Sequence, residues 1–174
     1  MSSKKNVTRV LIHAPIKKVW EALTKHGEPL PFFFGSVMHT SGLQPGAQIR
    51  MRTACGKYTG VVGEILEVDP PFRFSHTFKF TQRNDPACKV TYELKEIEGG
   101  TEFTLFSDDL IDGTPTSKDM ISGAPIITNT LKSLVETGEI PFQSRLILLM
   151  CRLMKPFTPK VCLSEHWPLD KASE

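Results

Sequence analysis

Apolar residues recur at two spacings along this chain, one typical of strands and the other of helices. In residues 72–81, 89–97 and 102–107 they alternate with polar residues, which predicts half-buried strands. In residues 117–138 they recur every three or four positions, which predicts a long amphipathic helix. The chain therefore changes from mostly strand to helix after residue 107.

The predicted helix over residues 117–138 has one apolar face. Thr116 and Asp119 form a weak capping box at its start. Pro125 suits a first helical turn, and Gly138 is a natural stop. The residues of the apolar face are Ile127, Leu131, Leu134 and Val135.

Short turns separate the other predicted elements. A strand over residues 7–13 leads into a short helix over 16–24, whose apolar stripe places Trp20 in the core. Two prolines in residues 27–34 break regular structure. Further strands are predicted over 37–40, 48–53, 58–68, 72–81, 89–97 and 102–107. Sequential strands with short turns favour an antiparallel meander, which the long helix is able to cover on one face.

The strand FRFSHTFKFT concentrates aromatic side chains on one face. Its residues of one parity are Phe72, Phe74, His76, Phe78 and Phe80. His76 in their midst has two interpretations. It is either the polar contact of a small-molecule pocket or a core histidine whose hydrogen bond goes to a neighbouring strand.

Two loops carry further candidate residues. Phe32, Phe33 and Phe34 precede Gly35, and we expect them to lie at the mouth of a pocket or to plug the end of the core. An acidic turn is predicted after the last strand, with Asp108, Asp109 and Asp112. Its carboxylates would act as an acid/base pair only if they faced a cleft.

The tail contains a six-residue apolar run, Leu146 to Cys151, between Arg145 and Arg152. This run is far shorter than the roughly 18–20 apolar residues of a spanning helix. Packing on the domain or a dimer contact is the base interpretation, and a membrane-surface position is the alternative. Three prolines predict that the last twenty residues form an irregular strap, with Trp167 as its anchor.

Composition and motifs narrow the functional classes. A net charge of +2 without a basic stripe does not indicate nucleic-acid binding. The polar start MSSKKN is not a signal peptide. The four cysteines lack metal-ligand spacing, so we expect free thiols in a reducing cytoplasm. No cofactor, metal or nucleophile motif is found in the sequence.

The chain resembles the SRPBCC (START-like) superfamily, and within it the bacterial proteins similar to the activator of heat-shock protein 90 ATPase. The motifs that carry the resemblance are IHAPIKKVWEALT, PFFFG, VVGEILEVDPPFRFSHTF and LKSLVETG, between about residues 6 and 140. The resemblance implies a helix-grip fold with a deep apolar cavity. Relatives bind lipids, sterols, plant hormones or polyketides, and a few catalyse cyclisation.

We therefore expect an α+β helix-grip (START-like) fold, with an antiparallel sheet of about six or seven strands around a long C-terminal helix. Residues 1–140 would form this domain. Residues 141–174 would form a C-terminal helical extension that packs on the domain or at a dimer contact.

The expected function is the binding of a small hydrophobic molecule, without a cofactor or metal, between the sheet and the helix. The alternatives are an interaction module (a chaperone partner, or a homodimer through residues 141–167) and a polyketide-cyclase-like enzyme. The expected ligand-binding residues are Phe33, Phe34, Met51, Phe74, His76, Phe78, Tyr92, Phe103, Ile127, Leu131 and Leu134.

Overall fold

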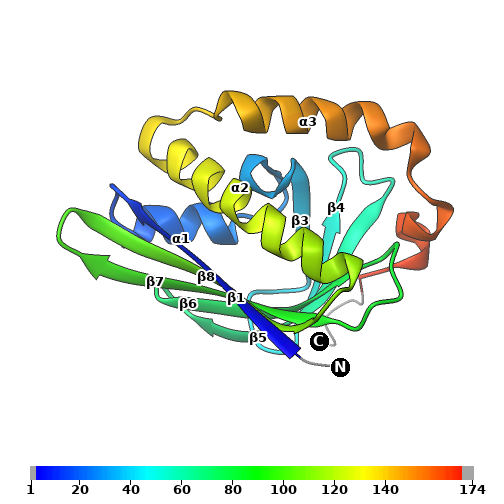
Figure 1. Ribbon diagram of the computed structural model, residues 1–174, viewed down its shortest axis with the longest axis horizontal. Helices are drawn as coiled ribbons and strands as arrows, with labels where there is room; N and C mark the ends of the chain where they lie inside the picture. The colour runs from blue at the N-terminus through cyan, green and yellow to red at the C-terminus, as the bar shows by residue number, and fades with distance from the viewer. Residues whose placement is uncertain (1–2, 170–174) are drawn as a thin grey trace.

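Figure 1 shows the computed structural model, which describes residues 3–169. In this part of the chain, eight strands form one antiparallel sheet in the order β1-β8-β7-β6-β5-β4-β3-β2. The strands are β1 (Ser3–Ile12), β2 (Pro29–Leu30), β3 (Ser36–Thr40), β4 (Gln48–Arg52), β5 (Thr59–Asp69), β6 (Arg73–Phe80), β7 (Cys88–Ile97) and β8 (Gly100–Ile111). The predicted helix-grip fold is confirmed, with slightly more strands than expected because Pro29–Leu30 pairs with β3.

Within residues 3–169, three helices and four short 3-10 helices complete the fold. They are α1 (Ile16–Thr24), α2 (Pro115–Thr137), α3 (Phe142–Met154), η1 (Pro31–Phe33), η2 (Lys155–Phe157), η3 (Lys160–Cys162) and η4 (Ser164–His166). Helix α2 crosses one face of the curled sheet, and α3 lies on the far side of α2 from the sheet (Figure 1). The part of the chain that the structure describes has no helix long and apolar enough to cross a membrane.

The main core lies between the sheet and helices α1 and α2. Its largest fully buried apolar side chains are Ile12, Val19, Ile49, Ile65, Phe74, Phe103, Leu110 and Leu131. Trp20 packs edge-on against Phe74 with ring centroids 6.5 Å apart, as expected for a core position. Burying an aliphatic or aromatic side chain of this kind stabilises the fold by about 1.5–3 kcal/mol.

Helix α2 begins two residues earlier than predicted. Thr114, rather than Thr116, is the capping residue, because its Oγ1 accepts a hydrogen bond of 3.1 Å from the backbone N–H of Ser117. Pro115 takes the first turn, so Pro125 lies inside the helix and its predicted place in the first turn is wrong. The predicted end is confirmed: Gly138 is left-handed, with φ 76°.

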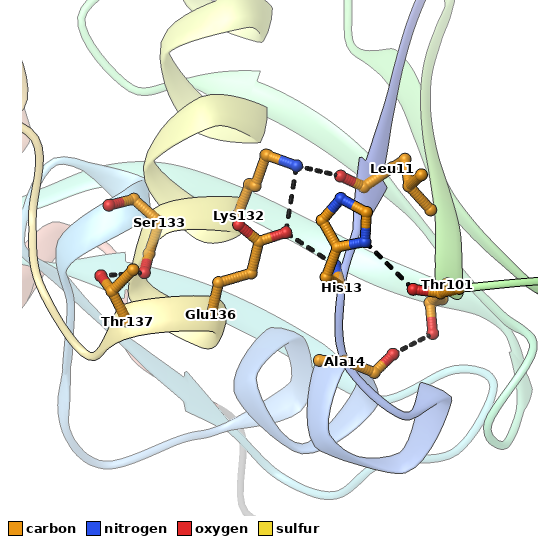
Figure 2. A network of polar contacts seen from close by, with 9 residues as sticks. Leu11, His13, Ala14, Thr101, Lys132, Ser133, Glu136 and Thr137 are labelled. Carbon is orange, nitrogen blue, oxygen red and sulfur yellow. Dashed lines mark hydrogen bonds and ion pairs between the residues drawn. The ribbon is translucent and has the colours of Figure 1, made fainter.

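Polar contacts attach the last turns of α2 to the end of β1 (Figure 2). The backbone N–H of His13 donates to Oε1 of Glu136 at 2.6 Å. The Lys132 ammonium group donates to the carbonyl of Leu11 and pairs with Glu136 at 3.0 Å. These bonds hold the helix at a set angle across the sheet.

The predicted acidic turn is part of a strand instead. Strand β8 continues to Ile111, so Asp108 and Asp109 lie within it. Asp108 pairs with Lys5 at 3.3 Å and Asp112 with Lys4 at 2.7 Å. The lysines of β1 offset the poor strand propensity of aspartate, and the carboxylates form no acid/base pair.

Phe72 is also placed differently from the prediction. It lies in the turn before β6, where its backbone N–H donates to the carbonyl of Asp69 at 2.7 Å. Its side chain is 48% exposed, so it does not continue the aromatic face of β6. The turn, and not the alternation of residue types, decides its direction.

After α3 the chain returns to the sheet as a C-terminal strap, residues 158–169. The backbone N–H of Ser164 donates to the carbonyl of Lys57 at 3.0 Å, and its hydroxyl lies 3.0 Å from that of Thr59. Trp167, the expected anchor, donates from Nε1 to the carbonyl of Val161 at 2.7 Å. Its own carbonyl accepts from Arg52. The strap thereby closes one end of the space between sheet and helix.

Candidate ligand-binding cavity

An apolar cavity of about 240 Å³ lies beneath the N-terminal half of α2. Strands β5 to β8 form its floor, and the strap and the turn after η1 close its ends. Its apolar lining consists of Phe33, Phe34, Val61, Phe78, Phe80, Val90, Leu105, Met120, Ala124 and Ile127. Among the helix residues that line it, Gly123 and Ala124 are small and take up little of the space.

The three consecutive phenylalanines divide between the two expected roles. Phe32 is buried in the core, where it plugs the end of the domain. Phe33 and Phe34 line the cavity, and the Phe33 ring packs against Phe78 with centroids 6.3 Å apart. Phe34 also borders a surface groove beside α3, so it lies at the rim of the cavity.

One buried hydroxyl group at the cavity lacks a hydrogen-bond partner. Within residues 3–169, Oγ of Ser107 has no partner although the residue is fully buried. Tyr92 also lines the cavity, and burial of the residue raises the pKa of its phenol. Buried polar groups are nearly always bonded, so the Ser107 hydroxyl is the first candidate polar contact of a ligand, and the phenol of Tyr92 is the second.

His76 lies beside the cavity and not in its wall. Together with Met51 and Phe74 it borders a separate small void of about 20 Å³, which Tyr92 also lines. Nδ1 of His76 lies 2.7 Å from the backbone carbonyl of Thr77. Burial lowers the pKa of His76 to about 4, so the ring is neutral at pH 7. This geometry matches the core-histidine interpretation, except that the carbonyl comes from its own strand.

Gly63 on β5 allows that arrangement of His76. A Cβ atom at position 63 would lie 2.0 Å from the carbonyl oxygen of Thr77, the same oxygen that faces Nδ1 of His76. A side chain here would displace the carbonyl and its hydrogen bond. The close approach of β5 and β6 therefore requires glycine at this position.

Five of the eleven predicted ligand-binding residues line the cavity: Phe33, Phe34, Phe78, Tyr92 and Ile127. Three others, Met51, Phe74 and His76, line the small void. Phe103 and Leu131 are completely buried in solid core, and Leu134 borders a shallow surface groove near α1. The cavity lies under the first half of α2, whereas Leu131 and Leu134 lie in its second half.

Sequence reasoning missed other lining residues. Ser107 could have been found, because it shares its parity with the inward-facing Phe103 and Leu105. Thr158 and Cys162 come from the strap. Their place depends on how the tail returns to the sheet, and no local pattern predicts it.

The cysteines do not form a metal site. All four are unpaired, and Cys88 and Cys162 are buried. Across residues 3–169, no three His, Cys, Asp or Glu side chains gather as metal ligands would. Cys162 accepts a weak hydrogen bond from the Thr81 hydroxyl at 3.4 Å, which suits a packing role at the end of the cavity.

A curled antiparallel sheet around one long helix, with an apolar cavity between them, defines the helix-grip class of START-like proteins. Residues 13–136 match the family described as "Activator of Hsp90 ATPase homolog 1-like protein". The match spans more than half of the chain, which therefore belongs to this family of the SRPBCC superfamily. No curated protein sequence matches significantly.

Solved structures share the fold at low sequence identity. Protein MLL2253 from Mesorhizobium loti is 19% identical, with a TM-score of 0.65, and the match covers 79% of this chain and all of that one. CalU16 from Micromonospora echinospora is 18% identical, with a TM-score of 0.63 and coverage of 85% and 83%. The Aha1 dimer from Colwellia psychrerythraea is 17% identical, with a TM-score of 0.64 and coverage of 78% and 98%.

Proposed function

We propose that this protein binds a small lipophilic molecule in the cavity beneath α2. The observation that carries the proposal is an apolar space of about 240 Å³ lined by the buried, unpartnered hydroxyl of Ser107. An apolar cavity of about 150 Å³ already accepts benzene, so this one has room for a larger ring system or a short acyl chain. The fold of the family supports the proposal as an analogy.

The lining also indicates the chemical class of the ligand. Asp119 at the rim pairs with Arg83, so its carboxylate is already compensated. Ser107 and Tyr92 offer hydroxyl groups, which donate to a carbonyl or accept from a hydroxyl. The proposed ligand is therefore an uncharged molecule with an apolar body and one or two oxygen atoms.

We also propose that the protein works in the cytoplasm. Its four cysteines are unpaired, and two of them are exposed. Disulfides form and persist in oxidising compartments, whereas thiols stay reduced in the cytoplasm.

The first test is native mass spectrometry of the freshly purified protein, followed by titration with the neutral probe N-phenyl-1-naphthylamine. A co-purified lipophilic molecule or saturable one-to-one probe binding would support the proposal. Ile127→Trp should fill the cavity and weaken probe binding by about tenfold or more, since a blocked site loses its apolar contacts.

Ile126→Trp is the matched control. Ile126 is also partly buried on α2 but does not line the cavity. Probe binding should therefore remain in this variant. Equal affinity of the wild type and of Ile127→Trp would refute the cavity as the binding site.

A further inference from the structure

Helix α3 turns an apolar stripe toward solvent. Phe142, Leu146, Leu149 and Leu153 follow one another at spacings of four, three and four residues, so they lie on one side of the helix. Their exposed fractions run from 52% to 80%. Further exposed apolar residues nearby are Met150, Met154, Phe157 and Val161. An exposed patch of this kind marks an interaction surface.

The opposite side of α3 is held against the domain. Ser144 is buried, and its hydroxyl lies 2.6 Å from that of Thr130 on α2. Leu148 packs so close to Gly35 that a Cβ there would lie 3.2 Å from its Cδ2. With this side docked, the exposed apolar stripe lies on the opposite side of α3. Packing within the chain therefore does not account for it.

The charges around the stripe all have one sign. Between Glu139 and Glu165 the chain has four basic residues and no acidic one. Arg145 and Arg152 are two turns apart and follow one edge of the stripe. In the described part of the chain, Arg152, Lys155 and Lys160 form no ion pair, and Arg145 approaches Glu139 only to 4.0 Å. The surface is both apolar and cationic.

We propose that α3 docks on an anionic lipid surface. Its apolar stripe would enter the boundary between headgroups and acyl chains, and its arginines and lysines would contact lipid phosphates. A second copy fits the surface less well. Pairing two such helices would bring eight basic residues together without an acidic partner from either segment, and such like-charge contacts are unfavourable.

The cavity rim lies next to α3. A surface groove beside α3 is lined by Leu148, Arg152 and Lys155, and it shares Phe34 and Thr158 with the cavity. Leu148 belongs to the docked side of α3, so the groove and the cavity rim lie between α3 and the domain. The docking proposal does not depend on the proposed ligand, because an empty cavity would leave the stripe and its charges unchanged.

The test is co-sedimentation of the full chain with lipid vesicles. One set contains phosphatidylcholine alone, and the other also contains about one quarter phosphatidylserine, close to an anionic leaflet. We expect binding to the anionic vesicles about tenfold or more tighter than to the neutral ones, and weaker at high salt. Arg145→Gln and Arg152→Gln should each reduce the anionic preference by about fivefold.

Leu149→Glu/Leu153→Glu should abolish binding to both kinds of vesicle. Leu66→Glu, at an exposed apolar residue of β5, is the matched control and should bind as the wild type does. All substituted residues are exposed, and circular dichroism checks that each variant is folded. The proposal is overturned if the wild type ignores anionic vesicles. It is equally overturned if light scattering finds a dimer that Leu149→Glu dissociates, because a second copy would then cover the stripe.

Discussion

Oε1 of Glu136 accepts a hydrogen bond of 2.6 Å from the backbone N–H of His13, which joins the last turn of α2 to the end of β1 (Figure 2). The two residues are 123 positions apart in the sequence. The bond therefore closes the sheet and the helix into one unit. It is the main reason that the pKa of Glu136 lies below its ordinary value, with Lys132 adding to the effect.

The first prediction concerns the charge of Glu136. Glu136→Gln should lower the free energy of unfolding at pH 7 by about 1 kcal/mol or somewhat more, because the hydrogen bond loses its ionised acceptor. The native pKa is lowered, so this stabilisation is complete above the ordinary value of 4.5 and is lost as the pH falls through the native pKa.

Denaturant unfolding of the wild type and Glu136→Gln at several pH values measures this difference. Glu139→Gln is the control, since Glu139 is exposed beyond the end of α2. Its substitution should leave the stability nearly unchanged. A stability difference for Glu136→Gln that grew toward low pH would contradict the assignment.

The second prediction concerns His76 and acid stability. Its pKa is about 4 in the native state and about 6.5 in the unfolded chain, because burial disfavours the charged ring. Between these values the unfolded chain binds a proton that the native protein does not. Stability should therefore fall with falling pH in this window, by up to about 1.4 kcal/mol per unit from this residue.

His76→Gln should remove that component of the pH dependence while keeping a group able to donate to the Thr77 carbonyl. The measurement is the free energy of unfolding between pH 4 and 6.5. The two pKa values of His76 set the limits of this range. Contributions from the rest of the chain are common to both proteins and cancel in the difference. Parallel pH curves for the two proteins would show that His76 is not buried as a neutral ring.

The third prediction concerns Ser107, whose substitution should change the free energy of unfolding and the ligand affinity in opposite directions. Oγ of Ser107 is buried without a partner, so Ser107→Ala should raise the free energy of unfolding of the ligand-free protein by about 1 kcal/mol. The same substitution should weaken a ligand that bonds to this hydroxyl. Ser75→Ala is the matched control, because its hydroxyl is also buried and unpartnered but does not line this cavity.

Ser75→Ala should therefore stabilise the protein without changing ligand affinity. Thermal unfolding and titration of both variants test the pair. If Ser107→Ala and Ser75→Ala had the same effect on binding, Ser107 would not be a ligand contact.

The fourth prediction concerns thiol reactivity. Cys55 is exposed, and a hydrogen bond with the Thr53 hydroxyl is the main cause of its lowered pKa. Burial raises the pKa of Cys88 to about 11. With iodoacetamide at neutral pH, Cys55 should react first and Cys88 only on unfolding, because the thiolate is the reactive form and must be accessible.

Mass spectrometry of the labelled peptides follows each site over time. In Cys55→Ser the fastest labelling phase should disappear. Labelling of Cys88 in the native protein at the rate of Cys55 would mean that the packing around β7 is looser than the structure shows.

Much of the fold follows from local pattern. The spacing of Ile16, Val19 and Leu23 predicts α1 with its observed bounds, because one stripe of a helix must face the core. The alternation in residues 89–97 predicts β7 to within one residue. Strand β8 extends further than predicted, since the pairing of Asp108 with a lysine of β1 is a tertiary contact that the local pattern does not contain.

The candidate site depends far more on contacts between residues that are distant in the sequence. Parity alone identifies Phe78 and Tyr92 as inward-facing residues, and both line the cavity. Parity identifies Phe103 equally well, yet its side chain is packed solid. The cavity lies under the first half of α2, which includes the small residues Gly123 and Ala124, so its position depends on where that helix crosses the sheet.

The sequence by itself determined which residues face inward and which element covers the sheet, because the periods of strands and helices are local properties of the chain. Only the tertiary structure decided where an apolar space remains open, that His76 bonds to its own strand, and that α3 turns its apolar stripe outward. These outcomes depend on contacts between residues far apart in the chain, such as Glu136 with His13 and Ser144 with Thr130. Such contacts set the angles and distances between elements that already have their own local pattern.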